Sequence, residues 1–392
     1  MLFIIAITVC SGFSLLAALA LIRVTAARRM KLLRLGTEAN VTVLKPLCGA
    51  DDSLEANLET FFLQRYLNYE LLFGVEGEND PAIAVVHRLR LRYPDIPCRL
   101  VIHNGARGLN PKVSNIRAML ESGSHDIIVI SDSNVAVSPD YLQKMVAELL
   151  EDNVGLVTSP IAGVGEKTFG ALLENMQLNS QIAGCVAASS LFGRSLVVGK
   201  SVMFRRSVFD RLGGFSSVAN VLAEDYVMGR MFQSAGYEVR LCQGIVRNVC
   251  AKTGFLAFVK RYLRWSVMRA RIKPLAYPFE PLCNPAAIAL LALISGAAGA
   301  WVLVWALTLI LIRDAICWVR LRGFSGLLSV LVLAPLKDLI MFGIWAAAPL
   351  VRHISWRSHR VRISAGTRLY ANRPMHIPEV SLHEEAPAVV RN

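Results

Sequence analysis

The sequence has little charge and lacks the common nucleotide-binding motifs. Only 18% of its 392 residues are charged and 54% are hydrophobic, whereas ordinary soluble proteins have about 25% charged residues. No Gly-x-Gly-x-x-Gly opens a helix after the first expected strand, and no Walker A sequence is present. These absences argue against dinucleotide oxidoreductases and P-loop NTPases. The composition also excludes disorder, collagen and coiled coil, and its apolar ends favour membrane attachment.

The cysteines form no recognisable framework. Eight are present, with no Cys-x-x-Cys pair, and two of them lie inside strongly apolar stretches. This pattern argues against a disulfide scaffold or a zinc site. We expect reduced and mostly buried thiols.

The amino end carries an uncharged apolar run, residues 2–22, that is long enough to cross a bilayer. No basic residue precedes the run, which favours a membrane helix (residues 1–23) over a signal peptide. The basic residues that follow it are Arg23, Arg28, Arg29, Lys31 and Arg34. The positive-inside rule therefore predicts an external amino terminus and a cytosolic domain, in what we expect to be a bacterial inner membrane.

Two further apolar blocks lie near the carboxyl end, at residues 285–312 and 327–351, and Lys337 and Asp338 interrupt the second. We expect residues 284–351 to form membrane helices or re-entrant segments, with the number of crossings open. The expected loop between the blocks and the basic tail (residues 352–392) contain Arg313, Arg320, Arg322, Arg352, Arg357, Arg360, Arg362 and Arg368. Both stretches favour the cytosolic side.

The net charge of +13 indicates an acidic partner. The basic residues border apolar blocks and do not interleave with aromatics along a soluble face. This arrangement favours anionic lipid headgroups over nucleic acid.

The middle of the chain alternates short β-rich runs with amphipathic segments, which is typical of an open, mostly parallel α/β sheet with flanking helices. The expected strands are 41–47, 70–75, 99–103 and 126–131, and the expected helices are 54–64, 82–92, 113–121 and 141–150. Ligands in such sheets bind at the carboxyl ends of the strands. We therefore expect one globular domain over residues 40–253, with its site at that edge.

Acidic residues stand at several such positions. Asp132 follows a buried strand, where it can hold a divalent cation shared with phosphate oxygens or accept backbone N–H bonds in the turn. Asp80 precedes Pro81 and can bind a ligand or cap the next helix. Glu224 and Asp225 precede an apolar helical pattern, where capping is again the alternative.

Residues 254–283 are expected to form an interfacial amphipathic helix. Arg261 and Arg264 are three residues apart and therefore share a face. Trp265 is typical of a membrane-interface anchor.

In this order the motifs resemble the membrane glycosyltransferases with a GT-A fold, and within them the ceramide glucosyltransferase family (family 21), including related hopanoid-associated enzymes. The resemblance runs from about residue 41 to about 366. It is carried by Asp80 in Asn-Asp-Pro, Asp132 in Ser-Asp-Ser, Asp225 in Glu-Asp-Tyr, Arg261–Trp265 in Arg-x-x-Arg-Trp, Lys45-Pro-Leu, residues 57–62, Asn110-Pro-Lys112, and Ile-Ser-Trp-Arg at 354–357.

The resemblance implies a UDP-sugar donor, a divalent cation (Mg²⁺ or Mn²⁺) and inversion at the anomeric carbon. It implies that Asp225 is the catalytic base and that Asp132 holds the cation. The implied donor-binding residues are Lys45, Asp80, Lys112, Asp132, Arg261, Arg264 and Trp265, so Asp132 has both roles. A guanidinium pair is suited to a pyrophosphate.

The chain departs from the usual pattern in two places. Asp132-Ser-Asn replaces Asp-x-Asp, so the cation has one carboxylate fewer. Ser180-Gln-Ile-Ala stands where animal members have His-Pro, which leaves the sugar open. Glucose is the leading sugar, with galactose, N-acetylglucosamine and glucuronate as alternatives. The leading acceptor is ceramide, and the alternative is a hopanoid polyol. Other hypotheses are a processive polysaccharide synthase and a non-enzymatic nucleotide-sugar sensor or transporter.

Overall fold

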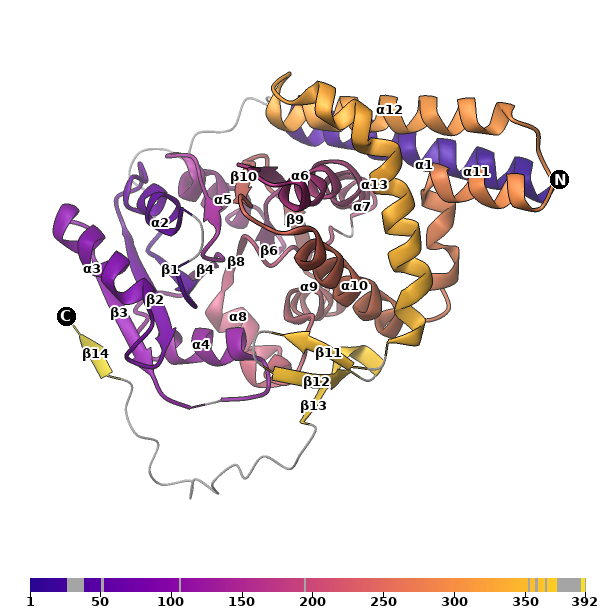
Figure 1. Ribbon diagram of the computed structural model, residues 1–392. Coiled ribbons are helices and arrows are strands. Elements are labelled where there is room, and N and C mark those ends of the chain that lie inside the picture. The colour runs from indigo at the N-terminus through magenta and orange to yellow at the C-terminus, as the bar shows by residue number, and fades with distance from the viewer. Residues whose placement is uncertain are drawn as a thin grey trace. The chain divides into compact units, whose positions relative to one another are not determined.

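A computed structural model describes residues 1–26, 39–50, 53–105, 107–193, 195–351, 353–356, 359–363, 365–371 and 389–391 (Figure 1). The chain forms two compact units. The helical unit comprises Met1–Arg28, Pro160–Ser195 and Arg247–Arg352, and the sheet unit comprises Arg29–Ser159, Leu196–Val246 and His353–Asn392. Residues 160–195 thus group with the apolar helices, although the predicted boundaries placed them within one domain of 40–253.

The sheet unit is built on an eight-stranded sheet with strand order β14-β3-β2-β1-β4-β8-β6-β9. The pairs β1–β2, β2–β3, β1–β4 and β6–β9 are parallel, whereas β8 runs antiparallel to β4 and β6. The predicted mostly parallel α/β sheet is confirmed. Its strands are β1 (Val41–Pro46), β2 (Tyr69–Glu76), β3 (Cys98–His103), β4 (Ile127–Ile130), β6 (Val154–Thr158), β8 (Val202–Arg205), β9 (Glu238–Leu241) and β14 (Val389–Arg391).

Helices flank this sheet. They are α2 (Leu54–Phe62), α3 (Ala82–Arg92), α4 (Pro111–Leu120), α5 (Tyr141–Leu149), α8 (Arg206–Arg211), a 3₁₀ turn (Phe215–Val218) and α9 (Glu224–Ser234). The start of α4 shows how local sequence sets a boundary. The side chain of Asn110 accepts a hydrogen bond from Val113 N at 3.1 Å, and Pro111 occupies the first turn.

The smaller strands of the sheet unit are β5 (Val135–Ala136) and an antiparallel set of β11 (His353–Trp356), β12 (His359–Ile363) and β13 (Leu369–Ala371). Leu222 N donates to the carbonyl of Thr367 at 3.0 Å, just before α9. Part of the predicted basic tail is therefore ordered and borders the segment that carries Glu224 and Asp225. Arg28, Arg29, Lys31, Arg34, Arg352 and Arg357 lie outside the described residues.

The helical unit contains the predicted apolar segments. Its elements are α1 (Leu2–Thr25), β7 (Ile161–Val164), α6 (Phe169–Gln177), a π-helical turn (Leu178–Ile182), α7 (Ala183–Ser190), β10 (Val246–Val249), α10 (Phe255–Ile272), a 3₁₀ segment (Tyr277–Cys283), α11 (Pro285–Ile294), α12 (Trp301–Arg322), α13 (Leu327–Ala347) and a final 3₁₀ turn (Ala348–Leu350). In the described part of the chain, Leu2–Thr25, Trp301–Arg322 and Leu327–Leu350 are long and apolar enough to cross a membrane. The 3₁₀ segment and α11 form a further pair, bent by 97°, that is a broken span or a re-entrant loop.

The apolar block 285–312 is divided between α11 and α12. Helix α12 continues to Arg322, so the predicted loop holding Arg313, Arg320 and Arg322 is wrong. Arg313 is buried in the helix because its guanidinium pairs with Asp314 and Asp338 at 2.8 and 2.9 Å. The carboxylate of Asp338, which is distant in sequence, therefore makes Arg313 compatible with an apolar helix.

Helices α1 and α12 lie side by side and run in the same direction (Figure 1). Trp305 Nε1 donates to Ser11 Oγ at 3.1 Å, and Arg320 Nε donates to Thr25 Oγ1 at 3.2 Å. The basic end of α12 is therefore at the same end as the carboxyl end of α1. If both helices cross the bilayer, these two ends lie on the same side of it.

Candidate active site

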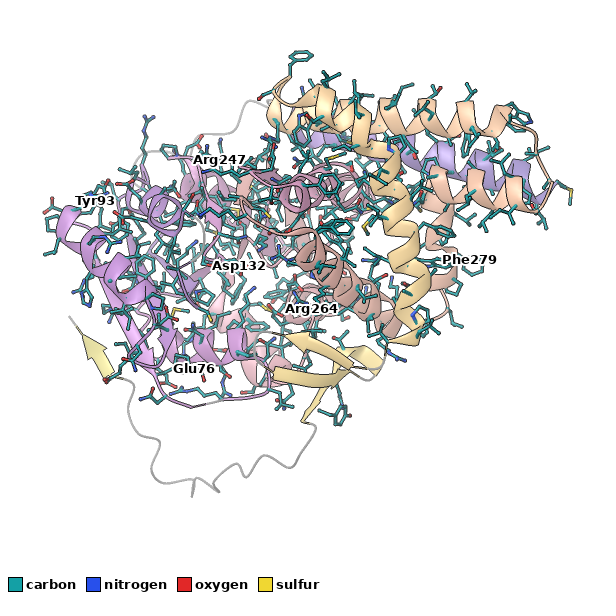
Figure 2. The ribbon with its side chains drawn as sticks, viewed as in Figure 1. Glu76, Tyr93, Asp132, Arg247, Arg264 and Phe279 are labelled. Atoms are coloured by element: carbon teal, nitrogen blue, oxygen red, sulfur yellow. The ribbon has the colours of Figure 1, made fainter. Side chains whose placement is uncertain are left out.

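The sheet unit brings several of the predicted site residues together at one edge of the sheet. Asp132 follows β4, and because β4 and β8 are antiparallel, Ile130 pairs with Val202. The segment just before β8 therefore lies beside the segment just after β4. Figure 2 shows where Asp132 lies among the side chains.

Lys112, in the first turn of α4, connects two of the acids. Its Nζ lies 2.9 Å from Asp132 Oδ1 and 3.0 Å from Glu224 Oε1, and it donates to the carbonyl of Gly199 at 3.1 Å. These contacts use all the N–H bonds of an ammonium group. Lys112 therefore holds the strand end, the start of α9 and the segment before β8 in one place.

Asp225 is fixed from the same segment. Gly199 N donates to Asp225 Oδ2 at 2.8 Å, and Tyr226 N donates to Asp225 Oδ1 at 2.7 Å. A Cβ added to Gly199 would lie 3.0 Å from Asp225 Oδ2 and 3.1 Å from Lys112 Nζ. Glycine at this position thus permits a close approach of acid and lysine, and Asp132 and Asp225 converge on the same contacts.

The cluster shifts the ionisation of its members. Burial alone would raise the pKa of Asp132, but Lys112 and Lys200 outweigh it and hold that pKa well below the usual range. Burial opposes the charge of Lys112, yet Asp132, Glu224 and Asp225 raise its pKa. Burial raises the pKa of Glu224, with the Asp225 charge adding to the effect and Lys112 opposing it.

Lys45 is fully buried in β1. Its Nζ donates to the carbonyl of Asp132 at 2.6 Å and lies 3.3 Å from Ser131 Oγ and 3.9 Å from the ring centre of Phe61. Burial lowers its pKa well below the usual value, and the charge of Asp132 offsets part of that effect. The hydrogen bonds of Lys45 are thus with the turn that carries Asp132.

Asp80 accepts backbone hydrogen bonds. Gly49 N lies 2.9 Å from Asp80 Oδ2, and Ala82 N donates to Asp80 Oδ1 at 2.8 Å. The carboxylate thus joins the loop after β1 to the start of α3. This geometry matches the capping interpretation of Asp80.

The arginine motif lies on α10 in the helical unit. Arg261 pairs with Glu174 of α6, which raises the Arg261 pKa against the opposing effect of burial. Burial and the neighbouring Arg261 charge lower the pKa of Arg264, which forms no hydrogen bond or ion pair with described residues of its own unit. Trp265 packs edge-on against Tyr262, with ring centres 5.2 Å apart.

Sequence reasoning assigned no role to two members of the cluster. Lys200 lies with its Nζ 3.0 Å from Asp132 Oδ2, and Asn110 Nδ2 donates to Glu224 Oε2 at 3.3 Å. Lys200 lies just before a short strand and carries no motif of its own. Only the antiparallel pairing of β8 with β4 brings it to Asp132.

Among the residues that the structure describes, no group of three or more His, Cys, Asp or Glu side chains is arranged to hold a metal ion. The turn after β4 offers the carboxylate of Asp132 and the amide oxygen of Asn134, and Lys200 contacts both, each at 3.0 Å. Hard cations that bind nucleotide phosphates often keep only one or two protein carboxylates. The donor set fits a cation shared with a ligand and does not fit an all-protein cage.

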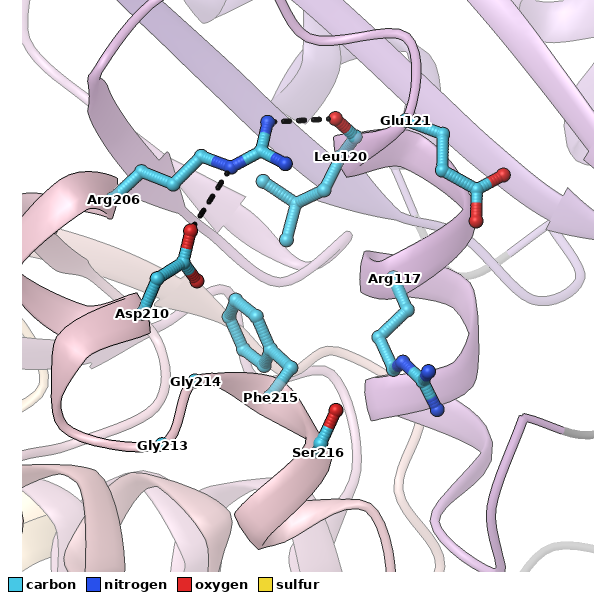
Figure 3. Close-up of a pocket in the computed structure, with 9 residues that line it drawn as sticks. All are labelled: Arg117, Leu120, Glu121, Arg206, Asp210, Gly213, Gly214, Phe215 and Ser216. Carbon is cyan, nitrogen blue, oxygen red and sulfur yellow. Dashed lines mark hydrogen bonds and ion pairs between the residues drawn. The ribbon is translucent and has the colours of Figure 1, made fainter.

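A separate hollow of about 310 Å³ lies at the opposite end of β4 and β8 (Figure 3). Arg206 there donates to the carbonyl of Leu120 at 3.0 Å and pairs with Asp210 at 3.5 Å. Because Ile127 pairs with Arg205 and Ile130 with Val202, this hollow is at the other edge of the sheet from Asp132. It is not part of the charged cluster.

The fold class is that of the GT-A glycosyltransferases. The structure is similar to that of the mannosyltransferase PcManGT from Pyrobaculum calidifontis, solved with GDP-Man and Mn²⁺, with a TM-score of 0.53 and 20% sequence identity. The similarity covers 89% of this chain and 99% of that one.

The chain belongs to glycosyl transferase family 21, whose sequence profile matches residues 3–369. It is 29% identical to ceramide glucosyltransferase 3 of Caenorhabditis elegans over 63% of this chain and 55% of that protein. It is 39% identical to the ceramide glucosyltransferase of Komagataella phaffii over 28% of this chain and 22% of that protein. The chain thus spans about half the length of the first of these relatives.

Proposed function

We propose that this protein is an inverting membrane glycosyltransferase that moves a sugar from a UDP-sugar to the hydroxyl group of a lipid. The observation that carries the proposal is the convergence of Asp132 and Asp225 on Lys112 and Gly199. A single displacement needs a base on one side of the sugar and positive charge on the side of the leaving group. The cluster supports the proposal because it gathers carboxylates and an ammonium group, the kinds of group that such a displacement uses.

In the proposed reaction the carboxylate of Asp225 accepts the proton of the acceptor hydroxyl. The hydroxyl oxygen forms a bond to the anomeric carbon as the bond from that carbon to the phosphate oxygen breaks. The bonding electron pair leaves with UDP. Gly199 N and Tyr226 N orient Asp225 for this role through their hydrogen bonds to its two oxygens.

Asp132 and Asn134 would hold the divalent cation, Mg²⁺ or Mn²⁺, which when bound neutralises negative charge on the leaving diphosphate. The charge of Asp132 is already balanced by Lys112 and Lys200. The diphosphate therefore brings negative charge that this cluster alone does not balance. Arg264 supplies further positive charge in our proposal, because Arg261 is already paired with Glu174.

Lys45 and Asp80 act indirectly in this proposal. Lys45 is buried and bonds the turn of Asp132, so it positions that carboxylate. Asp80 shapes the loop after β1 at the same sheet edge. Trp265 packs against Tyr262 of the same helix and in this way supports Arg264.

The proposed sugar is glucose and the proposed acceptor is ceramide. Two ceramide glucosyltransferases are among the relatives of the chain, and its apolar helices, which are long enough to cross a membrane, support access to a lipid hydroxyl. We place the sheet unit on the cytosolic side, following the positive-inside rule. A hopanoid polyol with UDP-N-acetylglucosamine is the second acceptor–donor pair to test, since related enzymes share the motifs.

The test uses the full chain in lipid nanodiscs with labelled UDP-glucose or UDP-N-acetylglucosamine and either ceramide or bacteriohopanetetrol. We expect one labelled sugar on ceramide, with inverted anomeric configuration. Label only on bacteriohopanetetrol would overturn the ceramide assignment, and a growing polymer would indicate a processive synthase. No labelled lipid with any pair would overturn the proposed function.

A further inference from the structure

We propose that Lys200 binds the diphosphate of the sugar donor directly, as a cationic residue in addition to those of the recognised motifs. This inference rests on the proposed function, because it concerns the same site. It assigns a substrate contact to a residue outside the motifs described above. Two lysines, Lys112 and Lys200, pair with Asp132 and differ in their contacts.

The backbone around Lys200 is held rigidly. Thr158 Oγ1 donates to the carbonyl of Ser201 at 2.9 Å, and the hydroxyls of Ser201 and Tyr141 are 2.8 Å apart. Ser201 is fully buried. Its neighbour Lys200 therefore projects from a fixed point beside Asp132, and only the lysine side chain needs to move to reach a ligand.

The two lysines differ in how many contacts hold them. Lys112 bonds Asp132, Glu224 and the carbonyl of Gly199, which uses all of its donors. Lys200 bonds the carboxylate of Asp132 and the amide oxygen of Asn134, so the structure assigns partners to two of its three donors.

The two lysines also differ in exposure. The Lys200 side chain is 23% exposed and that of Lys112 is 16% exposed. A lysine whose third donor is engaged by no described residue, and whose side chain is partly exposed, is suited to a phosphate oxygen. Lys112 is thus committed to holding the site together, whereas Lys200 is able to turn from Asp132 to an incoming diphosphate.

The binding experiment compares the full chain in nanodiscs with its Lys200→Met and Lys200→Arg variants, using UDP and uridine as probes in calorimetric titrations with Mg²⁺ present. Lys144→Met is the matched control, because Lys144 is also a partly exposed lysine of the sheet unit paired with an aspartate. We expect Lys200→Met to weaken UDP binding about tenfold and to leave uridine binding within about twofold, since only the diphosphate contact is lost. Lys200→Arg retains most of the UDP affinity, and Lys144→Met changes neither probe.

A second measurement needs no substitution. Lysine acylation of the unsubstituted chain, read by mass spectrometry, is expected to decrease at Lys200 when UDP is saturating and to stay constant at Lys144. Unchanged UDP affinity in Lys200→Met, or unchanged acylation of Lys200, would overturn this inference and leave the proposed function standing. A chain that does not bind UDP at all would overturn both.

Discussion

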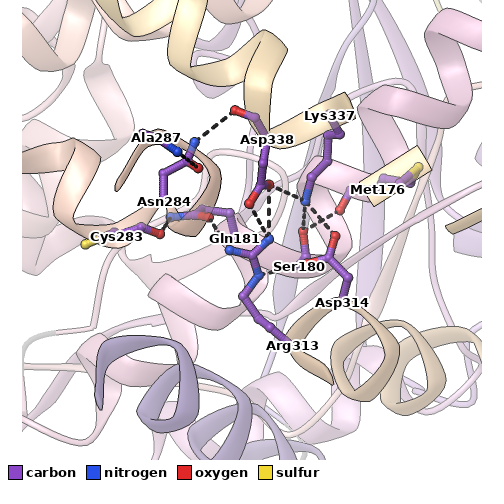
Figure 4. Close-up of polar contacts among 10 residues, drawn as sticks. All are labelled: Met176, Ser180, Gln181, Cys283, Asn284, Ala287, Arg313, Asp314, Lys337 and Asp338. Atoms are coloured by element: carbon purple, nitrogen blue, oxygen red, sulfur yellow. Dashed lines mark hydrogen bonds and ion pairs between the residues drawn. The ribbon is translucent and has the colours of Figure 1, made fainter. Parts of the chain in front are cut away.

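Two charged clusters in this protein are built from the same kinds of side chain and differ in how far they are closed. The cluster of the sheet unit joins Lys112, Lys200 and Asp132, and the side chain of Asp132 keeps 24% of its surface exposed. The cluster of the helical unit joins Arg313, Asp314, Lys337 and Asp338 (Figure 4), and none of its side chains is more than 4% exposed.

The cluster of the helical unit satisfies its own charges. Lys337 Nζ lies 2.7 Å from Asp314 Oδ2 and 3.2 Å from Asp338 Oδ1, and Arg313 pairs with both aspartates. The π-helical turn adds Ser180, whose hydroxyl oxygen accepts from Lys337 at 2.8 Å. The charges therefore join α12, α13 and the turn after α6 and balance one another.

In our proposal, the difference separates a cluster that binds a ligand from one that stabilises the fold. A closed and neutral cluster has no need of a ligand, and breaking it leaves a buried charge unpaired. In an open cluster some members are partly exposed, so a charged ligand can compete for them. Substitutions in the sheet unit should therefore change activity, and substitutions in the helical unit should change stability.

The largest expected effect is on turnover. Asp225→Asn keeps the size of the side chain and removes the proposed base, so kcat should fall by a factor of about 10² to 10⁴, the range that a general base contributes. The thermal unfolding temperature should change little. Labelled sugar transfer in nanodiscs measures the rate.

Asp210→Asn, an exposed residue of the same unit, is the control for this substitution. Turnover of Asp225→Asn equal to that of the control would remove Asp225 as the base.

Breaking the closed cluster should mainly affect folding. Asp338→Ala leaves Arg313 without one of its partners, and the free energy of unfolding should fall by about 3–5 kcal/mol. The yield of monodisperse protein and its unfolding temperature in detergent report this loss.

The double variant Asp314→Leu with Lys337→Met removes one charge of each sign and should lose less stability than Asp338→Ala. If both variants unfold like the unsubstituted chain, the cluster does not have the structural role described above.

An intermediate effect is expected when the arginine motif is substituted. Arg264→Ala should weaken donor binding and lower kcat/KM by an amount equivalent to about 2–5 kcal/mol. The reason is that the proposed hydrogen-bonded pair between Arg264 and the donor diphosphate loses its cation. Donor titrations at saturating acceptor give KM and kcat separately.

Arg271→Ala, in the last turn of the same helix, controls for a general loss of positive charge. A donor KM and a turnover that match those of the control would rule out a pyrophosphate role for Arg264.

The smallest expected effect is that of salt concentration, which should act differently on the two clusters. Raising the salt concentration from about 0.05 to about 0.5 M shortens the Debye length, so UDP affinity at the open cluster should fall severalfold. The closed cluster is shielded from ions, and the unfolding temperature should change little. Calorimetric titration and thermal scans at matched salt provide the two readings. Equal salt sensitivity of both would contradict the distinction between open and closed clusters.

The short elements of the sheet unit were largely predictable from local sequence. Residues 82–92 were expected to form a helix and form α3, and the strand expected at 41–47 is β1 at Val41–Pro46. Apolar periodicity and turn residues are local signals, so they locate elements without knowledge of the rest of the chain.

The roles of individual charges were not predictable in this way. The expected loop after residue 312 is part of α12, because its arginine has a partner in α13. Lys200 was not singled out, because its contact with Asp132 depends on strands paired across the sheet. Ion pairs between distant residues have no periodicity that a sequence can display.

The amino-acid sequence by itself determined the alternation of strands and helices, the apolar ends and the acids at strand ends, since each follows from residues close together in the chain. Only the tertiary structure decided that, among the described residues, Lys112 bonds three partners and Lys200 bonds two. It also decided that the charges of α12 and α13 neutralise one another. The physical reason is that electrostatic pairing depends on distance in space, which the fold alone establishes.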